Sequence, residues 1–243
     1  MKISLENKVA ILTGGGGGIG RAAAEKLARL KMHVVLLGGN RQETLAETGK
    51  LVKKYSSCTI IPGNLTDFTF LDTAVKEIID RCGKADVLIN NAGVAQNTPF
   101  EQISIEEFDR IMAINAKVPF FLTQKLLPYL KKSDHATVIN IASVVSHAGY
   151  PLQSAYTASK HALLGFTKSL AREYFKDNIR VHAICPGGVY TNMVKISRPD
   201  LTSEGMIRPE EIADIIAFFL ENRGNAIIDE ILVHRSSKEP FSV

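Results

Sequence analysis

The sequence of 243 residues is poor in cysteine and lacks a long apolar run. Its three cysteines, Cys58, Cys82 and Cys185, show no metal-ligand spacing, so we expect no metal site and interpret them as buried free thiols of a reducing compartment. No uncharged apolar stretch reaches the roughly 18 to 20 residues that cross a bilayer, and no basic-then-apolar leader opens the chain. These absences predict a soluble cytoplasmic protein that does not enter a membrane.

An excess of one charge sign is also missing. The formal net charge is only +4, and the short basic clusters Lys53-Lys54 and Lys131-Lys132 lie near expected helix ends, where cations suit the helix dipole. We therefore expect no nucleic-acid partner. The chain shows no repeat, low-complexity tract or linker, which predicts one domain over residues 1–235 and a flexible tail over residues 236–243.

Short aliphatic or β-branched segments alternate along the chain with longer amphipathic ones. The first six apolar segments lack polar alternation, which is typical of parallel strands covered by helices on both faces. The pattern predicts a single-domain, Rossmann-like α/β fold with a doubly wound parallel sheet. The expected strands span residues 9–13, 34–37, 59–62, 87–90, 137–141, 180–184 and 226–233.

Two helix starts have recognisable caps. Thr66-Asp67 precedes a helical segment that ends at Cys82-Gly83, and Ser104 with Glu107 forms a capping box before a long segment whose end lies just after Pro128.

A glycine-rich turn, residues 13–21, follows the first expected strand and leads into a helix start at Ala22-Ala23-Ala24. Glycines allow a pyrophosphate to approach the backbone amides of a helix N-terminus, where the dipole favours negative charge. A flexible loop would have the same composition, but the strand before and the helix after are the context that a dinucleotide site requires. The turn therefore predicts cofactor binding.

The acidic residue that holds the ribose hydroxyls in many dinucleotide sites is missing. Residues 26–42 contain no Asp or Glu, and the second expected strand leads to Gly38, Asn40 and Arg41. Without a carboxylate there is no repulsion against a 2′-phosphate, and Arg41 offers a positive charge. This favours NADP and leaves NAD possible, since Arg41 could equally be a solvated side chain.

Tyr156 and Lys160 lie four residues apart, and Ser143 lies upstream at the end of an apolar segment. On a helix, this spacing brings the lysine ammonium toward the phenol, whose ordinary pKa is about 10, and favours its ionised form. The pair is thus a candidate general acid and base, although a solvated lysine beside a half-buried ring has the same spacing.

These motifs, in this order, resemble those of the short-chain dehydrogenase/reductase family, and within it the 3-oxoacyl-acyl-carrier-protein-reductase-like carbonyl reductases. The resemblance covers nearly the whole chain. It implies a catalytic tetrad of Asn115, Ser143, Tyr156 and Lys160. It also implies that Tyr156, Lys160 and the following residues bind the cofactor: Gly14, Gly16, Gly17, Gly18, Ile19, Gly38, Asn40, Arg41, Asn64, Leu65, Asn91, Ala92, Gly93, Pro186, Gly187, Val189 and Thr191.

The resemblance further implies reversible hydride transfer between the nicotinamide C4 and a carbonyl or alcohol carbon. Ser143 and Tyr156 are expected to donate hydrogen bonds to the substrate oxygen, with Tyr156 giving up its proton. Lys160 is expected to hold the nicotinamide ribose and to lower the pKa of Tyr156. Asn115 is expected to anchor a water that links Lys160 to solvent.

The chain departs from the family pattern in three places. Gly17 and Gly39 stand where relatives that use NADP often carry arginine, and Asn64 replaces an aspartate that faces the adenine amine. An amide oxygen can still accept that hydrogen bond. Residues 228–235 lack the common Gly-Gly-containing ending, which puts a tetramer in doubt.

The expected partners are a small carbonyl or alcohol substrate and a second copy of the chain, in a homodimer or homotetramer built on the helical segments 105–127 and 155–174. The substrate wall is expected from residues 94–100, 144–152 and 190–208, which are mostly apolar. An acyl-carrier substrate, as in 3-oxoacyl-carrier reduction of fatty-acid synthesis, is the alternative, with Lys195, Arg198 and Arg208 as its cations. A catalytically inactive dinucleotide-binding regulatory protein is a further alternative, which the complete tetrad disfavours.

Overall fold

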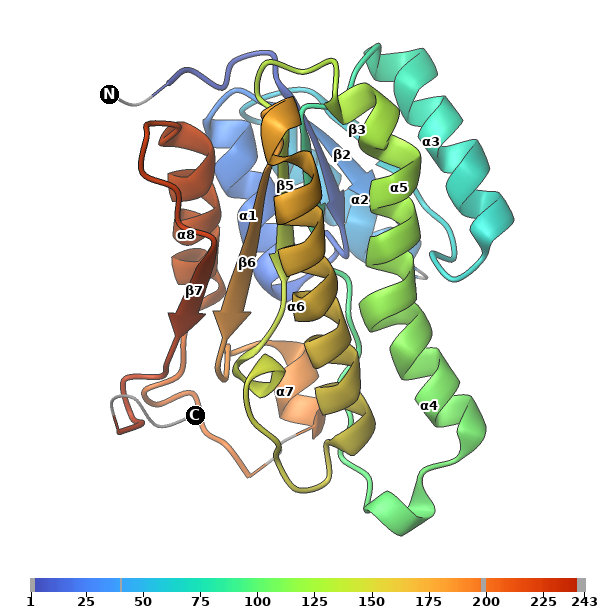
Figure 1. Cartoon of the computed structure of the whole chain (residues 1–243), viewed down its shortest axis with the longest axis vertical. Coiled ribbons are helices and arrows are strands. Elements are labelled where there is room, and N and C mark those ends of the chain that lie inside the picture. The colour runs from blue at the N-terminus through green and yellow to red at the C-terminus, as the bar shows by residue number, and fades with distance from the viewer. Residues whose placement is uncertain (1–2, 40, 198–199, 240–243) are drawn as a thin grey trace.

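The structure is a computed structural model that describes residues 3–39, 41–197 and 200–239. These residues form one parallel sheet of seven strands (Figure 1), which confirms the doubly wound parallel sheet that the sequence predicts. The strand order is β3-β2-β1-β4-β5-β6-β7. The strands are β1 (Val9–Thr13), β2 (His33–Leu37), β3 (Cys58–Ile61), β4 (Val87–Asn90), β5 (Thr137–Ile141), β6 (Arg180–Pro186) and β7 (Glu230–Val233).

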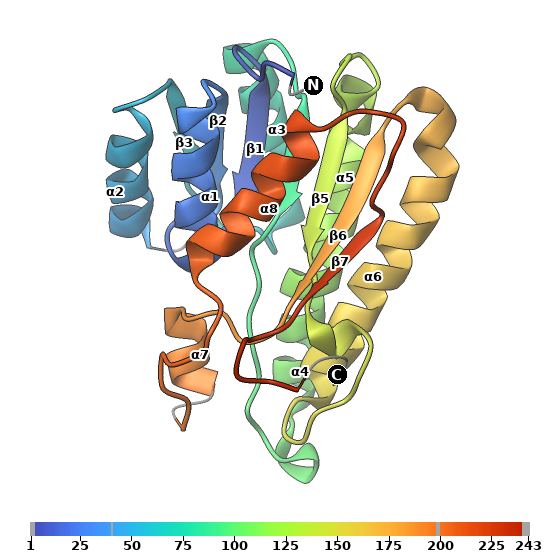
Figure 2. The same ribbon diagram turned by 90° about the vertical axis from the view of Figure 1, so that its left-hand side faces the viewer.

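Helices cover both faces of the sheet (Figure 2). Along β1, Ala10 and Leu12 pack into one apolar cluster with α1, α2 and α8, whereas Val9 and Ile11 pack into a second cluster with α3, α5 and α6. This alternation follows from the two-residue period of a strand. The helices are α1 (Gly18–Arg29), α2 (Gln42–Val52), α3 (Phe68–Cys82), α4 (Ile105–Met112), α5 (Val118–Leu130), α6 (Ser154–Tyr174), α7 (Asn192–Ser197) and α8 (Pro209–Glu221).

The last strand is shorter than the sequence predicts. The expected segment spans residues 226–233, but β7 begins at Glu230. The carbonyl of Ile228 accepts a hydrogen bond from the ring Nδ1 of His182, 2.7 Å away, so a side chain takes the place of a neighbouring strand there. The other strands agree with the expected ranges within two residues.

The predicted cap of α3 is confirmed. Asp67 Oδ1 accepts hydrogen bonds from the backbone N–H groups of Thr69 and Phe70, and the helix ends at Gly83 in the left-handed conformation. The capping box at Ser104 is only half formed. Ser104 Oγ accepts from the N–H of Glu107, but the Glu107 carboxylate accepts a hydrogen bond from Thr98.

The expected long helix from residue 105 is interrupted. A π-helical turn, Ala113–Lys117, separates α4 from α5 and contains Asn115. Such a turn adds a residue to the helical repeat and is frequent at functional sites. Here it places Asn115 on the buried side, where only 1% of the residue is exposed.

The C-terminal segment is partly described. Ser236 Oγ donates a hydrogen bond to the Gly205 carbonyl and the Lys238 N–H donates to the Arg235 carbonyl. Residues 240–243 of the expected tail lie outside the described residues, so the domain boundary stays a prediction. Within the described part of the chain, no helix combines the length and apolarity that spanning a membrane requires.

Candidate active site

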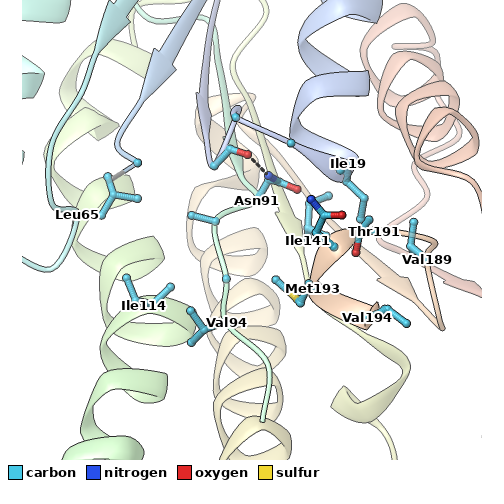
Figure 3. Close-up of a pocket in the computed structure, with 18 of the residues that line it drawn as sticks. Ile19, Leu65, Asn91, Val94, Ile114, Ile141, Val189, Thr191, Met193 and Val194 are labelled. Carbon is cyan, nitrogen blue, oxygen red and sulfur yellow. Dashed lines mark hydrogen bonds between the residues drawn. The ribbon is translucent and has the colours of Figure 1, made fainter. Parts of the chain in front are cut away.

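A cavity of about 590 Å³ opens at the carboxyl ends of the strands (Figure 3). It brings together most of the residues predicted for the site: Gly14, Gly16, Gly17, Gly18, Ile19, Arg41, Asn64, Leu65, Asn91, Ala92, Gly93, Ser143, Tyr156, Lys160, Pro186, Gly187, Val189 and Thr191. Two predicted residues, Gly38 and Asn115, are not among the residues that line the cavity. The predicted Asn40 lies outside the described residues.

The glycine turn is held against the end of β4. Thr13 Oγ1 accepts hydrogen bonds from the N–H groups of Asn91 and Ala92, each 3.0 Å away. In return, Asn91 Nδ2 donates to the Thr13 carbonyl at 3.0 Å and to the Gly14 carbonyl at 3.2 Å, and Figure 3 shows this side chain reaching the turn. A Cβ on Gly20 would lie only 2.2 Å from the Gly14 oxygen, so the turn closes only with glycine at position 20.

The N-terminus of α1 fits a pyrophosphate. Its N-cap, Gly17, makes no side-chain hydrogen bond, and the first turn carries no acidic residue. A Cβ on Gly17 would meet no atom within 4 Å, so its backbone faces open space in the cavity. The first amides of α1 are therefore free of a side-chain cap and can receive an anion at the positive end of the helix dipole.

At the far end of the cavity, Leu65 covers Gly38, since a Cβ on Gly38 would lie 2.5 Å from Leu65 Cγ. Asn64 Oδ1 accepts hydrogen bonds from the N–H and hydroxyl of Thr66, at 3.1 and 2.8 Å. An adenine amine would have to replace one of these two donors, and the expected contact stays a prediction.

Arg41 is the N-cap of α2, and its exposed side chain lines the cavity. Among the described residues, no carboxylate forms an ion pair with it. Gly39, which the sequence marks as a departure from the arginine of relatives, lines the same end. Sequence patterns did not identify Thr44, Leu45 and Gly63, which line it too. Thr44 in particular sits at the glycine turn, because a Cβ on Gly16 would lie 2.6 Å from Thr44 Oγ1. Only the folded backbone brings these two segments together.

Ser143 and Tyr156 meet in the middle of the cavity. Ser143 lies two residues after the end of β5 and caps the 3-10 turn Val144–Ser146, and Tyr156 lies in the first turn of α6. Both side chains line the cavity, and Ser143 lies close enough to the phenol to lower the pKa of Tyr156. The Ser143 hydroxyl also lies 3.3 Å from the Pro186 carbonyl, to which it can donate. Both residues thus border the same cavity, where their hydroxyl groups could hold one substrate oxygen.

Lys160 lies one helical turn after Tyr156 but does not bond to its hydroxyl. Its Nζ donates to the Ile141 carbonyl at 2.7 Å and lies 5.8 Å from the centre of the Tyr156 ring. Burial lowers the pKa of Lys160 to about 8. Burial also raises the pKa of Tyr156, and the nearby Ser143 hydroxyl opposes that rise. The sequence led us to expect that Lys160 lowers the pKa of Tyr156. In this structure burial and Ser143, and not Lys160, set the direction of that pKa.

Asn115 supports the site from behind. Its Oδ1 accepts from the Val94 N–H, and its Nδ2 donates to the Val94 carbonyl and to Ser159 Oγ, at 2.9 to 3.0 Å. Ser159 Oγ in turn donates to the Tyr156 carbonyl at 2.7 Å. Asn115 therefore joins the loop after β4 to the helix that carries Tyr156. One lone pair of Oδ1 is left for the expected water.

Gln96 is a positioning residue that the sequence did not reveal. Its Oε1 accepts hydrogen bonds from the N–H groups of Ala155 and Tyr156, at 2.9 and 3.1 Å, and the residue is 2% exposed. The N-cap of α6, Gln153, makes no side-chain cap of its own. Gln96 supplies that cap from 59 residues away, a distance at which no local sequence pattern can signal it.

The rest of the cavity wall is largely apolar. Val94, Ile114, Met193 and Val194 contribute to it (Figure 3). None of residues 144–152, part of the expected substrate wall, lines this cavity.

The basic residues expected near the substrate are engaged elsewhere or undescribed. Lys195 Nζ lies over the Tyr190 ring at 4.6 Å from its centre, and the N-cap Arg208 pairs with Glu211. Arg198 lies outside the described residues.

Two curated proteins illustrate what this chain is similar to. The 3alpha-hydroxysteroid dehydrogenase of Mediterraneibacter gnavus is 35% identical over 244 residues, covering 96% of this chain and 97% of that protein. A 3-oxoacyl-(acyl-carrier-protein) reductase of Aquifex aeolicus is 30% identical over 241 residues, covering 96% and 97%.

Solved structures agree in fold and differ in cofactor. A metagenomic short-chain oxidoreductase in complex with NADP superimposes with a TM-score of 0.83 at 28% identity, covering 97% of this chain and 100% of that one. A short chain dehydrogenase from Mycobacterium paratuberculosis bound to NAD gives a TM-score of 0.85 at 25% identity, covering 96% and 97%. A model of the family described as short chain dehydrogenase matches residues 8–202. The chain therefore belongs to the short chain dehydrogenase family and is an oxidoreductase that uses a nicotinamide dinucleotide on alcohol or carbonyl substrates.

Proposed function

We propose that the protein is an NADP-linked carbonyl reductase, working reversibly as an alcohol dehydrogenase, with Tyr156 as general acid and base. The observation that carries this proposal is the meeting of the Ser143 and Tyr156 hydroxyls in a cavity that also contains the glycine turn and Lys160. An inactive dinucleotide-binding protein would have no need of this arrangement.

The protein's own groups have distinct roles in the proposal. When bound, the nicotinamide supplies or accepts the hydride. Ser143 holds the substrate oxygen by a hydrogen bond, and Tyr156 donates its proton to that oxygen as negative charge develops there. Lys160, whose pKa is about 8, is largely a cation at neutral pH and offers its remaining N–H donors to the nicotinamide ribose. Asn115 and Gln96 hold the helix of Tyr156 in place.

The preference for NADP rests on Arg41. The NADP-bound and NAD-bound structures resemble this chain about equally, so likeness does not decide between the two cofactors. Arg41 lines the cavity near Gly39 and Thr44, and residues 26–42 carry no acid that would repel a 2′-phosphate. The Thr44 hydroxyl beside Gly16 donates its proton to the Arg41 carbonyl at 3.0 Å and so ties the residue to the start of α2.

We propose a bulky, mainly apolar ketone or secondary alcohol as substrate. The apolar wall of Val94, Ile114, Met193 and Val194 supports this class, as does the similarity to a hydroxysteroid dehydrogenase. A 3-oxoacyl-carrier substrate is the alternative. Lys195 lies over Tyr190 and Arg208 pairs with Glu211, both at exposed positions, so an acidic phosphopantetheine would have to compete with these contacts.

We further propose that the protein is a cytoplasmic homodimer. Its three cysteines are all free thiols, as a reducing compartment would leave them. An apolar groove, here called the α4–α6 groove, offers a surface for a second copy. It is lined by Asp109, Met112, Ala113, Ala116, Lys117, Phe120, Phe121, Ala162 and Phe166.

The proposal is tested by following absorbance of the reduced nicotinamide with each cofactor over a substrate panel. The panel should contain a hydroxysteroid and its ketone, 3-hydroxybutyrate, and a 3-oxoacyl thioester. We expect turnover with the steroid pair and a kcat/KM at least about tenfold higher with NADPH than with NADH. Arg41→Gln should lose that preference while keeping turnover with NADH. A preference for NADH in the wild type would refute the role of Arg41, and cofactor binding without turnover of any carbonyl or alcohol would refute the enzyme.

A further inference from the structure

Three metal-ligating side chains meet just outside the cavity. His147 follows the 3-10 turn Val144–Ser146, Cys185 lies in β6 and Glu230 begins β7. Cys185 Sγ lies 3.2 Å from Glu230 Oε1, and His147 Nε2 is hydrogen-bonded to the same oxygen. The three ligand atoms all lie within 4.8 Å of one another. Two of the three residues belong to adjacent strands of the sheet, so their positions are fixed by the fold.

The donor set suits zinc. Thiolate, imidazole and carboxylate are its usual ligands, and three protein ligands with one open position are typical of non-structural zinc sites. At the usual bond lengths a tetrahedral zinc separates such ligand atoms by about 3.4 to 3.6 Å. The His147 ring would move slightly away from Glu230 and toward Cys185 to meet that geometry. About a third of the His147 side chain is open to solvent, at 32% exposure.

The surroundings allow an ion to enter. The side chains of His147 and Glu230 are 32% and 23% exposed, whereas Cys185 is fully buried behind them. An ion would therefore approach from solvent through the first two. Lys168 carries a positive charge beside the cluster, with its Nζ 3.8 Å from Glu230 Oε2, but its side chain is 60% exposed and can turn into solvent. Lys160 lies on the cavity side of Cys185 and is held by the Ile141 carbonyl.

We propose that His147, Cys185 and Glu230 bind zinc(II), with water in the fourth position. On binding, the Cys185 thiol loses its proton to solvent and its sulfur forms the bond to zinc. The neutral His147 ring passes its Nε2 proton through solvent to Nδ1, so that Nε2 and the Glu230 carboxylate oxygen give up their mutual hydrogen bond and each bind the metal. The sequence predicts no metal site because Cys185 and Glu230 lie 45 residues apart and His147 and Glu230 lie 83 apart. Ligand spacing reveals only sites built from neighbouring residues.

The ion would act on the proposed active site, a consequence that rests on the proposed function. Cys185 precedes Pro186, whose carbonyl lies 3.3 Å from the Ser143 hydroxyl. His147 follows the short turn that Ser143 caps. Zinc would therefore tie together the two segments that position Ser143. We expect it to lower kcat and to leave the affinity for the dinucleotide unchanged.

The site itself is tested without any assay of turnover, by titrating the reduced full-length protein with cobalt(II) as a spectroscopic substitute for zinc. We expect a thiolate-to-cobalt charge-transfer band in the near ultraviolet and the intense visible bands of a tetrahedral ion. Zinc should displace the cobalt at one equivalent per chain. Cys185→Ser should abolish the charge-transfer band, and Glu230→Gln and His147→Asn should each weaken zinc binding at least tenfold in a chelator competition.

Cys82→Ser and His161→Asn are the matched controls, because these residues lie outside the cluster. Both should bind cobalt and zinc as the wild type does. A charge-transfer band that persists in Cys185→Ser, or that the Cys82→Ser control removes, would overturn the assignment. So would the absence of any band in the wild type, provided that circular dichroism shows each protein to be folded.

Inhibition is a separate measurement. We expect one equivalent of zinc to lower kcat of the wild type at least tenfold and to leave Glu230→Gln unaffected at the same concentration. If cobalt binds through Cys185 and turnover is unchanged, the metal site stands and its link to Ser143 is refuted. If no substrate is turned over, the cobalt spectrum still decides the site.

Discussion

The charged ammonium group of Lys160 is buried in the protein. The residue is 4% exposed, and burial lowers its pKa from 10.5 to about 8. The unfolded chain therefore holds this proton over a pH range in which the folded chain has lost it. Stability then rises with pH between about 8 and 10.5, because the unfolded state binds more protons there.

The first prediction compares Lys160→Met with the wild type by urea denaturation at pH 7 and at pH 9.5. As pH rises, the free energy of unfolding of the wild type should increase by about 2 kcal/mol relative to the variant, since only the wild type sheds the cost of a buried charge. Lys50→Met, a change at an exposed lysine of α2, is the control and should show no such relative change. A constant difference between wild type and Lys160→Met at both pH values would contradict the buried charge.

The sequence could predict those site residues that belong to a recognisable motif. Ser143, Tyr156 and Lys160 lie in the cavity as the motifs predict. Gln96 and Thr44 could not be predicted, because their partners are brought to them only by the folded backbone. The direction of the Tyr156 pKa was also not predicted. Helical spacing does not indicate how deeply a pair is buried, and burial is the main cause of the pKa changes of Tyr156 and Lys160.

The glycine turn between β1 and α1 contains glycines with two different requirements. Gly20 packs against the Gly14 carbonyl, so any side chain there forces the backbone apart. Gly17 has an extended backbone that other residues adopt and no neighbour within 4 Å of a Cβ, but it borders the cavity. One position thus serves the fold and the other serves the ligand.

The second prediction separates these two roles. Gly20→Ala should lower the free energy of unfolding by about 1 to 3 kcal/mol and weaken dinucleotide binding, because the turn itself is distorted. Gly17→Ala should change stability by no more than about 1 kcal/mol and still weaken binding at least about tenfold, because its methyl group enters the pyrophosphate position. Calorimetric titration and thermal unfolding measure both. Normal dinucleotide affinity in Gly17→Ala would contradict the binding of the pyrophosphate at the N-terminus of α1.

Elements with a strong local pattern were predictable, and those set by tertiary contacts were not. Apolar runs located all seven strands, and Asp67 and Gly83 marked both ends of α3. The π-helical turn at Asn115 was missed because its residues have an ordinary helical pattern. The late start of β7 was missed because the His182 side chain, not a local signal, takes the Ile228 carbonyl.

The whole molecule presents an exposed apolar surface along the α4–α6 groove. Phe120 in this groove is 44% exposed, and its ring packs against that of Phe166, 5.0 Å between centres. Large apolar surfaces of this kind mark sites of association. Because α6 also carries Tyr156 and Lys160, self-association here would stiffen the element on which the proposed chemistry depends.

The third prediction concerns this groove. Ala162→Glu places a charge among its apolar residues and should convert a dimer to monomers in sedimentation velocity at micromolar concentration, since an unpaired charge is costly to bury. Ala46→Glu, at an exposed position of α2, should leave the sedimentation coefficient unchanged. If Ala162→Glu still sediments as the wild type does, self-association uses another surface or does not occur.

The turnover of Tyr156→Phe under saturating cofactor and substrate tests most directly whether Tyr156 is the general acid and base. The change removes only the hydroxyl that donates the proton, so we expect kcat to fall at least about 10²-fold. The affinity for the dinucleotide and the free energy of unfolding should stay close to those of the wild type. Near-normal turnover in Tyr156→Phe would contradict the assignment of Tyr156 as the general acid and base.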